Sequence, residues 1–350
     1  MDKRTEYIVR KLIDTHSLDE SEYKELIEKR TEESALILKE EAVRLRKEIY
    51  GDSVFIRGLI EVSNICKNDC YYCGIRKSNR SCDRYRLGRE EILSCCKDGY
   101  ALGFRTFVMQ GGEDGFFTDD FLCGVIKEIK ALYPDCAVTL SLGERSRESY
   151  ERLYEAGADR YLLRHETADS GHYSRLHPES LTLANRMECL RNLKEIGFQT
   201  GCGFMVGSPF QTAECLAKDL KFIESFKPDM VGIGPFIPHK DTPFRGCPAG
   251  SAELTCFLLS VIRIIHPPVL LPSTTALGTL QEGGREKGIL HGANVIMPNL
   301  SPTDVRDKYM LYNNKLSTGA ESAQKLDELK RKIDSVGYKI VTEKGDIIKK

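Results

Sequence analysis

Between residues 54 and 297, short apolar runs rich in β-branched side chains alternate with longer amphipathic stretches. Short apolar runs are typical of buried strands, whereas apolar positions three or four residues apart are typical of helices. The pattern predicts eight strands, at 54–62, 105–109, 137–142, 160–163, 200–206, 230–233, 269–272 and 294–297. It predicts helices between most of them, at 89–102, 119–132, 147–156, 181–196, 213–226, 252–265 and 281–290.

Three of the predicted helices are followed by a glycine shortly before the next strand, at Gly103, Gly157 and Gly197. Glycine at that place ends a helix and turns the chain towards a strand. Strands joined by helices in this way predict an α/β protein with a (β/α)8 barrel of TIM type. A doubly wound open sheet is the alternative, because strand order cannot be read from one sequence. In a barrel, functional residues lie at or just after the carboxyl ends of the strands.

The two ends of the chain differ from this repeating middle part. Residues 1–50 are highly charged and helical in pattern, with a capping box predicted at 17–20. Residues 301–350 are polar and rich in lysine, with one helix predicted at 322–336. We therefore expect an N-terminal helical segment (1–50), a barrel (51–300) and a C-terminal extension (301–350) that could cover one end of the barrel.

The composition is that of an ordinary globular protein, since 41% of the 350 residues are hydrophobic and 29% are charged. The formal net charge of -1 gives no field that would attract nucleic acid or an anionic membrane. The N-terminus has no apolar segment typical of a secretory signal. The most apolar window, 257–271, is interrupted by Arg263 and His266 and is too short to span a membrane. We expect a monomeric cytoplasmic protein that binds neither nucleic acid nor membranes.

Three of the 13 cysteines stand close together, directly after the first predicted strand. Cys66, Cys70 and Cys73 form a C-x3-C-x2-C loop. Three thiolates at this spacing can bind one [4Fe–4S] cluster and leave one iron open to a small molecule. Tyr72, inside the loop, would pack beside the cluster and limit the access of water. The odd number of cysteines and the size of the chain argue against a disulfide framework.

A structural zinc site and plain buried thiols are the alternatives for this loop. Zinc sites usually combine a C-x2-C pair with a second pair of Cys or His residues. His165 or His239 could contribute to such a pair, but the spacing of the three cysteines and their place at a strand end favour the cluster. The remaining cysteines show no such grouping and none follows Cys256, so we expect a single cluster.

The second predicted strand is followed by Gln110, Gly111, Gly112 and Glu113. Adjacent glycines let the backbone approach a ligand closely, and the neighbouring carboxylate can accept hydrogen bonds from an ammonium group. A tight turn with a solvated glutamate is the alternative. The position of this turn, one strand after the cysteine loop, favours a ligand site.

The fourth predicted strand ends in Arg164, His165 and Glu166. Ionisable side chains in succession are costly to bury without partners, so we expect them to face a polar cavity. A surface patch of salt bridges is the alternative. Arg186, on the following helix, could bind a carboxylate through two guanidinium nitrogens or lie exposed. Arg57, within the first strand, would form an anion site if it pointed into the barrel.

Further strand ends complete a ring of candidate residues. The stretch 232–239 is apolar and stiffened by prolines, and it could form a wall for an adenine ring. Thr274 and Thr275 follow the seventh predicted strand, and Met297 ends the eighth. We therefore expect the active site at the carboxyl end of the predicted barrel.

The cysteine loop, the glycine-rich turn and the barrel pattern together resemble the radical S-adenosylmethionine superfamily. The resemblance implies that the three cysteines hold the cluster, whose open iron binds the amino and carboxyl groups of S-adenosylmethionine. In this superfamily, reduction of the cluster cleaves a C–S bond of the cofactor and produces a 5′-deoxyadenosyl radical. A reductant such as ferredoxin or flavodoxin is therefore an expected partner.

Several stretches between residues 54 and 300 resemble the HydE family of [FeFe]-hydrogenase maturases: FIRGLIEVSNIC, TLSLGE, DRYLLRHETA, DMVGIGPFIPH, PSTTALGT, GGRE and GANVIMPN. The C-terminal extension matches this family more loosely. The family builds the diiron subcluster of the hydrogenase. The resemblance implies an organometallic substrate, an iron–carbonyl–cyanide–cysteine complex delivered by a partner maturase, whose cysteine-derived part the radical attacks. Some members carry C-terminal cysteines for an accessory cluster, which this chain lacks.

The same resemblance implies roles for single residues. Besides the cluster ligands, these residues are expected along or near the cofactor: Tyr72, Gln110, Gly111, Gly112, Glu113, Glu166, Arg186, Met230 and Ile237. A second set is expected to face the substrate: Arg57, Arg164, Thr274, Thr275, Met297, Tyr309 and Tyr312. Two other functions stay open, namely a radical enzyme for a small amino acid, of biotin synthase or methylornithine synthase type, and a non-catalytic metal-binding protein.

Overall fold

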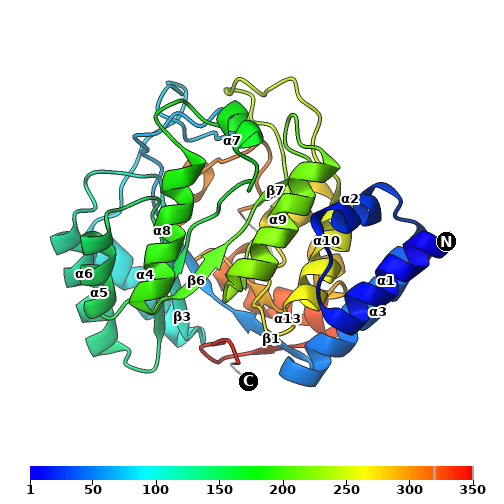
Figure 1. Ribbon diagram of the computed structural model, residues 1–350. Coiled ribbons are helices and arrows are strands. Elements are labelled where there is room, and N and C mark those ends of the chain that lie inside the picture. Colours follow the sequence, from blue (N-terminus) through cyan, green and yellow to red (C-terminus); the bar gives the residue numbers. More distant parts are fainter. Residues whose placement is uncertain (318–320, 349–350) are drawn as a thin grey trace.

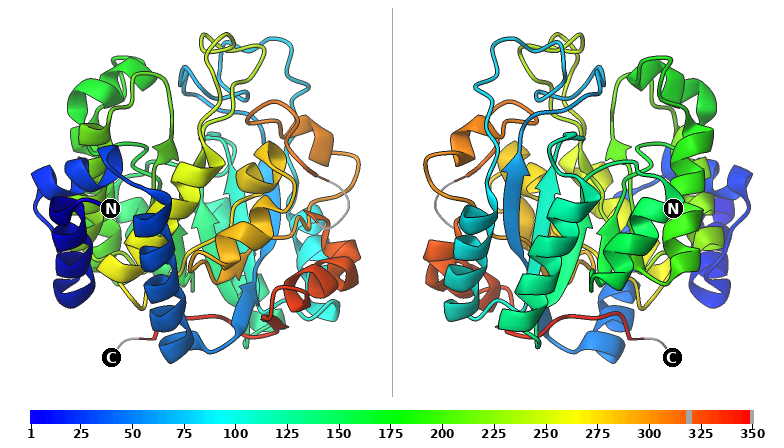
Figure 2. Two further views of the ribbon diagram at one scale, coloured as in Figure 1. Left: turned by 90° about the vertical axis from the view of Figure 1, so that its right-hand side faces the viewer. Right: turned by 90° about the vertical axis from the view of Figure 1, so that its left-hand side faces the viewer.

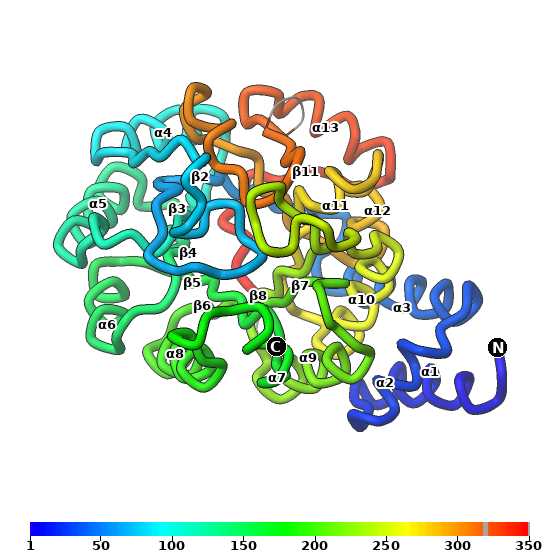
Figure 3. Tube along the Cα trace, turned by 90° about the horizontal axis from the view of Figure 1, so that it is seen from above, coloured from blue at the N-terminus to red at the C-terminus, as the bar shows by residue number. Residues whose placement is uncertain are grey.

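The structure, a computed structural model, describes residues 1–317 and 321–348. A ring of strands lies at its centre and helices surround the ring (Figures 1 and 3). One sheet contains β2, β3, β4, β5, β6 and β8 in this order. The bounds of these strands are Gly58–Ser63, Thr106–Gly111, Ala137–Ser141, Arg160–Leu162, Gln199–Cys202 and Met230–Val231.

The ring closes beyond the two edges of this sheet. At one edge, Met230 of β8 forms a bridge with Leu270, and Pro272 forms one with β10 (Val295–Ile296). At the other edge, β1 (Ser53–Ile56) leads directly into β2 and pairs with β10. All of these pairings are parallel, and the predicted (β/α)8 barrel is confirmed.

Several predicted strands are divided or shortened in the structure. The residues predicted as single strands at 54–62 and 200–206 form two strands each, namely β1 and β2, and β6 and β7 (Met205–Val206). The strand predicted at 230–233 is shortened to β8, and β9 (Gly234–Pro235) follows it. Gly203 causes one of these breaks, because it has a φ of 154° and a Cβ there would lie 2.0 Å from the carbonyl oxygen of Gly232. The strand predicted at 269–272 is present only as isolated bridges.

The helices on the outside of the barrel match the predicted helices to within a few residues: α4 (Arg89–Ala101), α5 (Asp119–Leu132), α6 (Arg147–Glu155), α8 (Leu183–Ile196), α9 (Ala213–Phe226) and α10 (Ala252–Ile265). The helix predicted at 281–290 is present as the shorter α12 (Gly284–Ile289), which begins after Gly283, a residue with a φ of 69°. The helix α11 (Thr275–Leu280), which precedes it, was not predicted. The short helix α7 (Ser170–Leu176) was not predicted. Within residues 1–317 and 321–348, no helix is long and apolar enough to cross a membrane.

The N-terminal part forms three helices that pack against the outside of α9 and α10: α1 (Lys3–Thr15), α2 (Glu20–Glu28) and α3 (Glu32–Tyr50). The capping box predicted at 17–20 is wrong by two residues, because Asp19 caps α2 and Glu22 completes the box. Ser17 does not cap this helix, since its hydroxyl donates a hydrogen bond to Glu224 of α9 at 2.8 Å.

The last residues of the C-terminal part close the amino end of the barrel. The described residues of this part include the short 3-10 helices η1 (Arg306–Lys308) and η3 (Ala323–Lys325), then α13 (Leu326–Asp334) and β11 (Lys339–Val341). Strand β11 pairs with β1, and the chain then passes below the barrel (Figure 2). The carbonyl oxygen of Lys344 accepts hydrogen bonds from Thr106 and Arg160, both at 2.9 Å. Because these residues begin β3 and β5, the tail lies across the amino ends of the strands.

Candidate active site

A cavity of about 350 Å³ lies at the carboxyl end of the barrel strands. Its volume is within the range of small-molecule sites. Most of the predicted site residues line it: Cys66, Cys70, Tyr72, Cys73, Gln110, Gly111, Gly112, Glu113, Arg164, Glu166, Arg186, Ile237, Thr274, Thr275, Met297, Tyr309 and Tyr312. The cysteines come from the loop after β2, whereas Tyr309 and Tyr312 come from the C-terminal part. Segments far apart in the sequence therefore converge on one site.

Two predicted site residues, Arg57 and Met230, are not part of this lining. The guanidinium of Arg57 donates a hydrogen bond to the sulfur of Met230 at 2.8 Å and contacts the carbonyl oxygen of Gly345 at 3.4 Å. Gly345 belongs to the tail below the barrel. Side chains two residues apart in a strand share a face, so Arg57 lies in the barrel one layer below Leu59, which does line the cavity. The expectation that Arg57 and Met230 face the site is therefore corrected: both residues lie deeper in the barrel than the residues that line the cavity.

The cysteine loop is held in place by its neighbours rather than by disulfides. All three thiols are free, and the residues around them are half-buried. Arg84 ties the loop together, because its guanidinium donates to the carbonyl oxygens of Ile75 at 2.8 Å and of Arg76 at 2.7 Å. The backbone of Gly74 donates a hydrogen bond to the carbonyl oxygen of Leu311 at 2.8 Å, which joins the loop to the C-terminal part. The three thiols are thus presented to the cavity by an ordered loop.

Tyr72 is anchored beside these thiols by a histidine. Its hydroxyl lies 3.2 Å from Nε2 of His177, and the rings meet edge to face with centroids 5.4 Å apart. Nδ1 of His177 lies 3.0 Å from the carbonyl oxygen of Tyr173, so this nitrogen is the donor. Nε2 is then the acceptor, and the hydroxyl of Tyr72 donates to it. Tyr72 is therefore oriented as a wall of the cavity.

The glycine-rich turn packs against the cysteine loop. A Cβ on Gly112 would lie 2.2 Å from the carbonyl oxygen of Ile65 and 2.8 Å from Cβ of Cys66. We expected glycine here because a ligand would approach the backbone. In the structure, glycine is needed because the cysteine loop packs against it. One carboxylate oxygen of Glu113 accepts a hydrogen bond from the backbone of Glu144 at 2.9 Å. The other lies 3.1 Å from the ammonium of Lys67, close enough for an ion pair but without a hydrogen bond among the described residues.

Arg164 and Glu166, at the end of the fourth predicted strand, line the cavity as expected, whereas His165 between them does not. Glu166 has a φ of 65°, which is unusual for a residue other than glycine, and its backbone donates to the carbonyl oxygen of Gly203 at 2.9 Å. Nη2 of Arg164 lies 3.2 Å from Oε2 of Glu166, close enough for an ion pair but not aligned as a hydrogen bond. Both groups are buried there without a hydrogen-bond partner among the described residues. They retain hydrogen-bonding capacity that a ligand could use.

Arg186 supports this strand end from α8. Its guanidinium pairs with the carboxylate of Glu144 and donates to the carbonyl oxygen of Arg164 at 2.6 Å. The carboxylate partner predicted for Arg186 is therefore, in this structure, a residue of the chain.

Two charged residues that the sequence did not reveal also line the cavity. Glu61 of β2 is fully buried, and it pairs with the ammonium of Lys315, whose side chain is 7% exposed. Lys315 also donates to the carbonyl oxygen of Tyr309 at 3.0 Å, and Asn299 donates to the other oxygen of Glu61 at 2.9 Å. A single carboxylate within the apolar run GLIEVS was the available signal for Glu61. No local signal distinguished Lys315.

The opposite wall carries the two predicted threonines. The hydroxyl of Thr275 donates to Glu321 at 2.9 Å, and Glu321 pairs with Arg285 behind it. The hydroxyl of Thr274 is buried without a hydrogen-bond partner in the described part of the chain. Thr274 is therefore available to a ligand, whereas Thr275 is held by the ion pair behind it.

Comparison with known proteins identifies this site. Residues 60–223 match the model of the radical SAM superfamily. Over 298 residues, which are 85% of this chain and 85% of the other protein, the sequence is 44% identical to the [FeFe] hydrogenase maturase subunit HydE of Thermotoga maritima. The chain belongs to the HydE family. The expected superfamily and family are confirmed, and this HydE-family protein is a radical SAM enzyme that uses a [4Fe–4S] cluster and S-adenosylmethionine.

More distant relatives share the fold. The 3-methylornithine synthase of Methanosarcina acetivorans is 27% identical over 332 residues, 93% of this HydE-family chain and 89% of that protein. A crystal structure of methylornithine synthase (PylB) has a TM-score of 0.84 at 24% identity and covers 95% of this chain, with 97% of its own length matched. The maturase HydG from Carboxydothermus hydrogenoformans has a TM-score of 0.78 at 21% identity, covering 97% of this chain and 79% of its own. Membership of an enzyme family contradicts the alternative of a non-catalytic metal-binding protein.

The residues of this HydE-family site fit both cofactors. Cys66, Cys70 and Cys73 line one cavity, and thiolates are the ligands of such clusters. In residues 1–317 and 321–348, no three His, Cys, Asp or Glu side chains form a group that could hold a single metal ion. The unpartnered oxygen of Glu166 and hydroxyl of Thr274 can accept or donate hydrogen bonds to a polar organic ligand.

The histidines proposed as zinc ligands have other partners. Nε2 of His165 lies 3.1 Å from Asp219, and Nδ1 accepts a hydrogen bond from the backbone of Gly203 at 3.3 Å. Nδ1 of His239 accepts one from the backbone of Asp241 at 3.1 Å. Both nitrogens of His165 are used inside the protein, and this histidine does not line the cavity. The zinc alternative therefore finds no support in the site of this HydE-family enzyme.

Proposed function

We propose that this enzyme acts in the maturation of [FeFe] hydrogenase, on an iron–carbonyl–cyanide–cysteine precursor of the diiron subcluster. The observation that carries the proposal is the 44% identity to the HydE subunit of Thermotoga maritima over 85% of both chains. The HydG neighbour, described as a maturase of the same hydrogenase, has the same fold. The cysteine loop at the carboxyl end of the barrel agrees with this function.

We infer that the enzyme binds its cofactors in the half of the cavity next to the cysteine loop. Cys66, Cys70 and Cys73 would hold one cluster, which supplies the electron that breaks a C–S bond of S-adenosylmethionine. The wall that would hold the organic cofactor consists of Tyr72, Gln110, Gly111, Gly112, Glu113, Glu166, Arg186 and Ile237. Tyr72 would be a rigid wall, since His177 fixes its hydroxyl.

The other half of the cavity would receive the substrate. Six residues of the cavity lining would face it, namely Thr274, Thr275, Met297, Tyr309, Tyr312 and Arg164. A complex that carries cyanide is anionic, and the guanidinium of Arg164 has nitrogens without a hydrogen-bond partner in the described structure. The side chain of Arg164 is 32% exposed, and a partly buried cation attracts an anion more strongly than a fully exposed one does. Arg164 would therefore anchor the complex.

Exclusion of water is the second contribution of the protein. A carbon radical reacts with whatever hydrogen donor it meets, so the cavity must be closed to solvent. The tail at 344–347 covers the amino end of the barrel. At the carboxyl end, the cysteine loop is tied to Leu311 and, through the backbone of Tyr71, to α7. These contacts would keep the reaction space dry.

The cellular setting follows from the same proposal. We propose a monomeric cytoplasmic enzyme that receives electrons from a carrier such as ferredoxin or flavodoxin. Other hydrogenase maturases are proposed as partners, since one of them must release the iron complex that this enzyme would use. We propose that the enzyme binds neither nucleic acid nor a membrane.

A second candidate is a radical SAM enzyme that acts on a small amino acid. It is favoured by the 27% identity to 3-methylornithine synthase over 93% of this chain. The pair of Glu61 and Lys315 also offers opposite charges inside the cavity, which would suit an amino acid. The maturase function ranks first, because the identity to the HydE subunit is much higher.

Anaerobic reconstitution tests the proposed function directly. With dithionite and S-adenosylmethionine, the enzyme should form 5′-deoxyadenosine, and adding the synthetic iron complex should yield an adenosylated or cysteine-cleaved product. C70A should abolish the cluster and both products. C123A, which removes a thiol on α5 far from the loop, is the matched control and should keep them. Turnover of ornithine or lysine with no reaction of the iron complex would favour the second candidate.

A further inference from the structure

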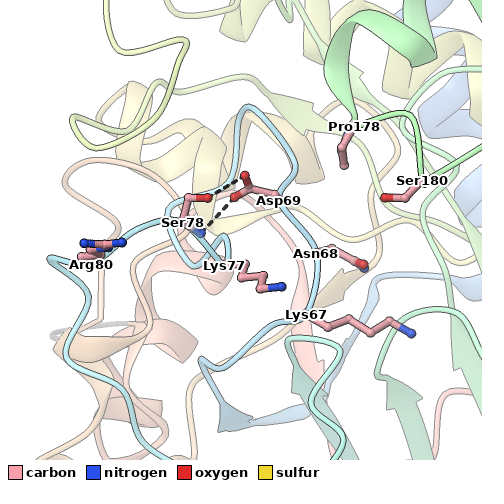
Figure 4. Close-up of a pocket in the computed structure, with 8 residues that line it drawn as sticks. All are labelled: Lys67, Asn68, Asp69, Lys77, Ser78, Arg80, Pro178 and Ser180. Carbon is pink, nitrogen blue, oxygen red and sulfur yellow. Dashed lines mark hydrogen bonds between the residues drawn. The ribbon is translucent and has the colours of Figure 1, made fainter.

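A second pocket, of about 500 Å³, lies on the surface beside the cysteine loop. Its lining residues are Lys67, Asn68, Asp69, Lys77, Ser78, Arg80, Pro178 and Ser180 (Figure 4). Residues 67–80 form one side, and the segment after α7 forms the other. The pocket is open to solvent.

This pocket and the active-site cavity share a wall. Asn68 lines both of them. Its neighbours Lys67 and Asp69 face the pocket, whereas Cys66 and Cys70 line the cavity. The outer side of the loop is therefore the surface pocket, and the inner side is the place proposed for the cluster. An electron that entered at the pocket would have only this loop to cross.

The pocket is positively charged. Lys67, Lys77 and Arg80 are exposed, and Lys77 and Arg80 have no carboxylate partner in the described part of the chain. The ammonium of Lys67 forms an ion pair with Oε2 of Glu113 at 3.1 Å, but the side chain of Lys67 is 65% exposed. The chain as a whole has a net charge of -1, so the excess of positive charge is a local property of this face.

Asp69 is the one carboxylate among the described lining residues, and its hydrogen bonds are all made within the cysteine loop. Asp69 accepts hydrogen bonds from the guanidinium of Arg76 at 2.7 Å and from the backbone and hydroxyl of Ser78, at 3.0 and 2.7 Å. Its charge is balanced by Arg76 within the loop. The positive charges of Lys67, Lys77 and Arg80 are therefore available to attract a partner.

The loop that carries these cations is already ordered. Arg84 donates to the carbonyl oxygens of Arg76 and Asn79, at 2.7 and 3.0 Å, and Lys77 donates from its backbone to Asn68 at 2.8 Å. A partner that docks on a preformed surface loses less conformational entropy than one that must order a loop. These hydrogen bonds therefore favour a docking surface that is ready before the partner arrives.

We propose that this pocket and its rim of Lys67, Lys77 and Arg80 form the docking surface for an acidic protein that carries single electrons. The proposal rests on the proposed function, because it requires a cluster at the inner side of the loop. In the complex, the carrier would be oxidised by one electron and the cluster reduced by one. Opposite charges on the two faces would steer the encounter and fix its orientation.

The test compares two electron donors on the reconstituted holoenzyme. A reduced flavodoxin serves as the acidic protein donor, and dithionite serves as a small donor that needs no docking surface. The variant K77E/R80E reverses two rim charges and leaves Lys67 and its contact with Glu113 intact. The variant K3E/R10E is the matched control, since it makes the same change in charge on α1, far from the loop. The readout is the initial rate of 5′-deoxyadenosine formation.

With flavodoxin at low ionic strength, K77E/R80E should be slower by about tenfold or more, because electrostatic steering changes association rates by that order. Added salt should reduce the difference, since it screens exposed charges. With dithionite, the same variant should react as fast as the unchanged enzyme, and K3E/R10E should behave normally with both donors.

Two results would overturn the proposal. The first is an unchanged flavodoxin rate in K77E/R80E, which would show that the carrier docks elsewhere. The second is an equal loss with both donors, which would show that the rim supports the cluster loop and not a partner. If the unchanged enzyme forms no 5′-deoxyadenosine even with dithionite, the proposed function fails instead, so the two failures are distinguishable.

Discussion

Nε2 of His165 lies 3.1 Å from Oδ1 of Asp219, and neither side chain has any exposed surface. The same carboxylate oxygen accepts a hydrogen bond from the backbone of Ala168 at 2.6 Å. On its other side, His165 accepts one from the backbone of Gly203. Asp219 of α9 therefore clamps the chain on both sides of Glu166, a cavity residue in an unusual backbone conformation.

Replacing Asp219 should disturb cofactor binding from outside the cavity. In D219A, His165 and the backbone of Ala168 lose their partner, at a cost of about 1–3 kcal/mol for a buried group left unsatisfied. Glu166 should then relax from its positive φ, and the KM for S-adenosylmethionine should rise more than kcat falls. Steady-state kinetics of 5′-deoxyadenosine formation and a thermal unfolding curve measure both effects.

The matched control for this clamp is D159A. Asp159 also accepts a backbone hydrogen bond, from Val138 at 2.7 Å, but it lies at the amino end of the barrel. Loss of this hydrogen bond should lower stability and leave the KM for the cofactor unchanged. If D219A and D159A lower stability alike and neither affects this KM, Asp219 has a structural role only.

Gly112 should be essential for cluster binding. A Cβ there would lie 2.2 Å from the carbonyl oxygen of Ile65, so G112A must displace the backbone directly before Cys66. We expect a folded protein with much less iron per chain after reconstitution. The control is G115A, because a Cβ on Gly115 meets nothing within 4 Å. Iron and sulfide analysis decides the matter, and full cluster occupancy in G112A would contradict the role assigned to this glycine.

The alternation of apolar runs along the chain was sufficient to predict the barrel, because each βα unit repeats the same pattern. The ring of site residues was predictable for the same reason, since Gln110 lies near the end of β3, and Cys66 and Glu166 lie shortly after the ends of β2 and β5. The depth at which an inward-pointing side chain lies inside the barrel was not predictable. Strand periodicity left open whether Arg57 points into the barrel, and it does not say how far this residue lies from the carboxyl end.

Contacts between distant segments also escaped the sequence. Lys315 is 254 residues from Glu61, and nothing near either residue indicates the other. The partner of His165 is on α9, where Asp219 reads as one more polar residue of an amphipathic helix. Such pairs depend on how the C-terminal part and the outer helices pack on the barrel, which the local pattern does not contain.

The ion pair of Lys315 and Glu61 should determine substrate binding and not cofactor cleavage. K315M leaves Glu61 buried without its counter-ion, and breaking such a pair costs about 3–5 kcal/mol. We expect a lower melting temperature and weaker binding of the anionic iron complex, with substrate-free formation of 5′-deoxyadenosine retained. The double variant E61Q/K315M should recover stability but not substrate binding. Equal loss of both reactions in E61Q/K315M would contradict this division of the cavity.

Stability should fall as the pH is lowered through a window set by buried histidines. Burial, reinforced by the cations of Arg263 and Lys227, lowers the pKa of His266 from its usual 6.5 to about 4. Between these values the unfolded chain binds a proton that the folded protein does not, so unfolding is favoured as pH falls from about 6.5 to about 4. Above that window the contribution of His266 to stability is fully present. Melting temperatures from pH 7.5 to 5 should therefore decrease.

The variant H266Q isolates this contribution, because other buried groups titrate equally in both proteins. Asp219, for example, has a pKa raised by burial and acts in the opposite direction. The melting temperature of H266Q should depend less steeply on pH between 6.5 and 5, while the two proteins differ by a constant amount above pH 7. Parallel curves over the whole range would mean that His266 is protonated in the folded protein as readily as in the unfolded chain.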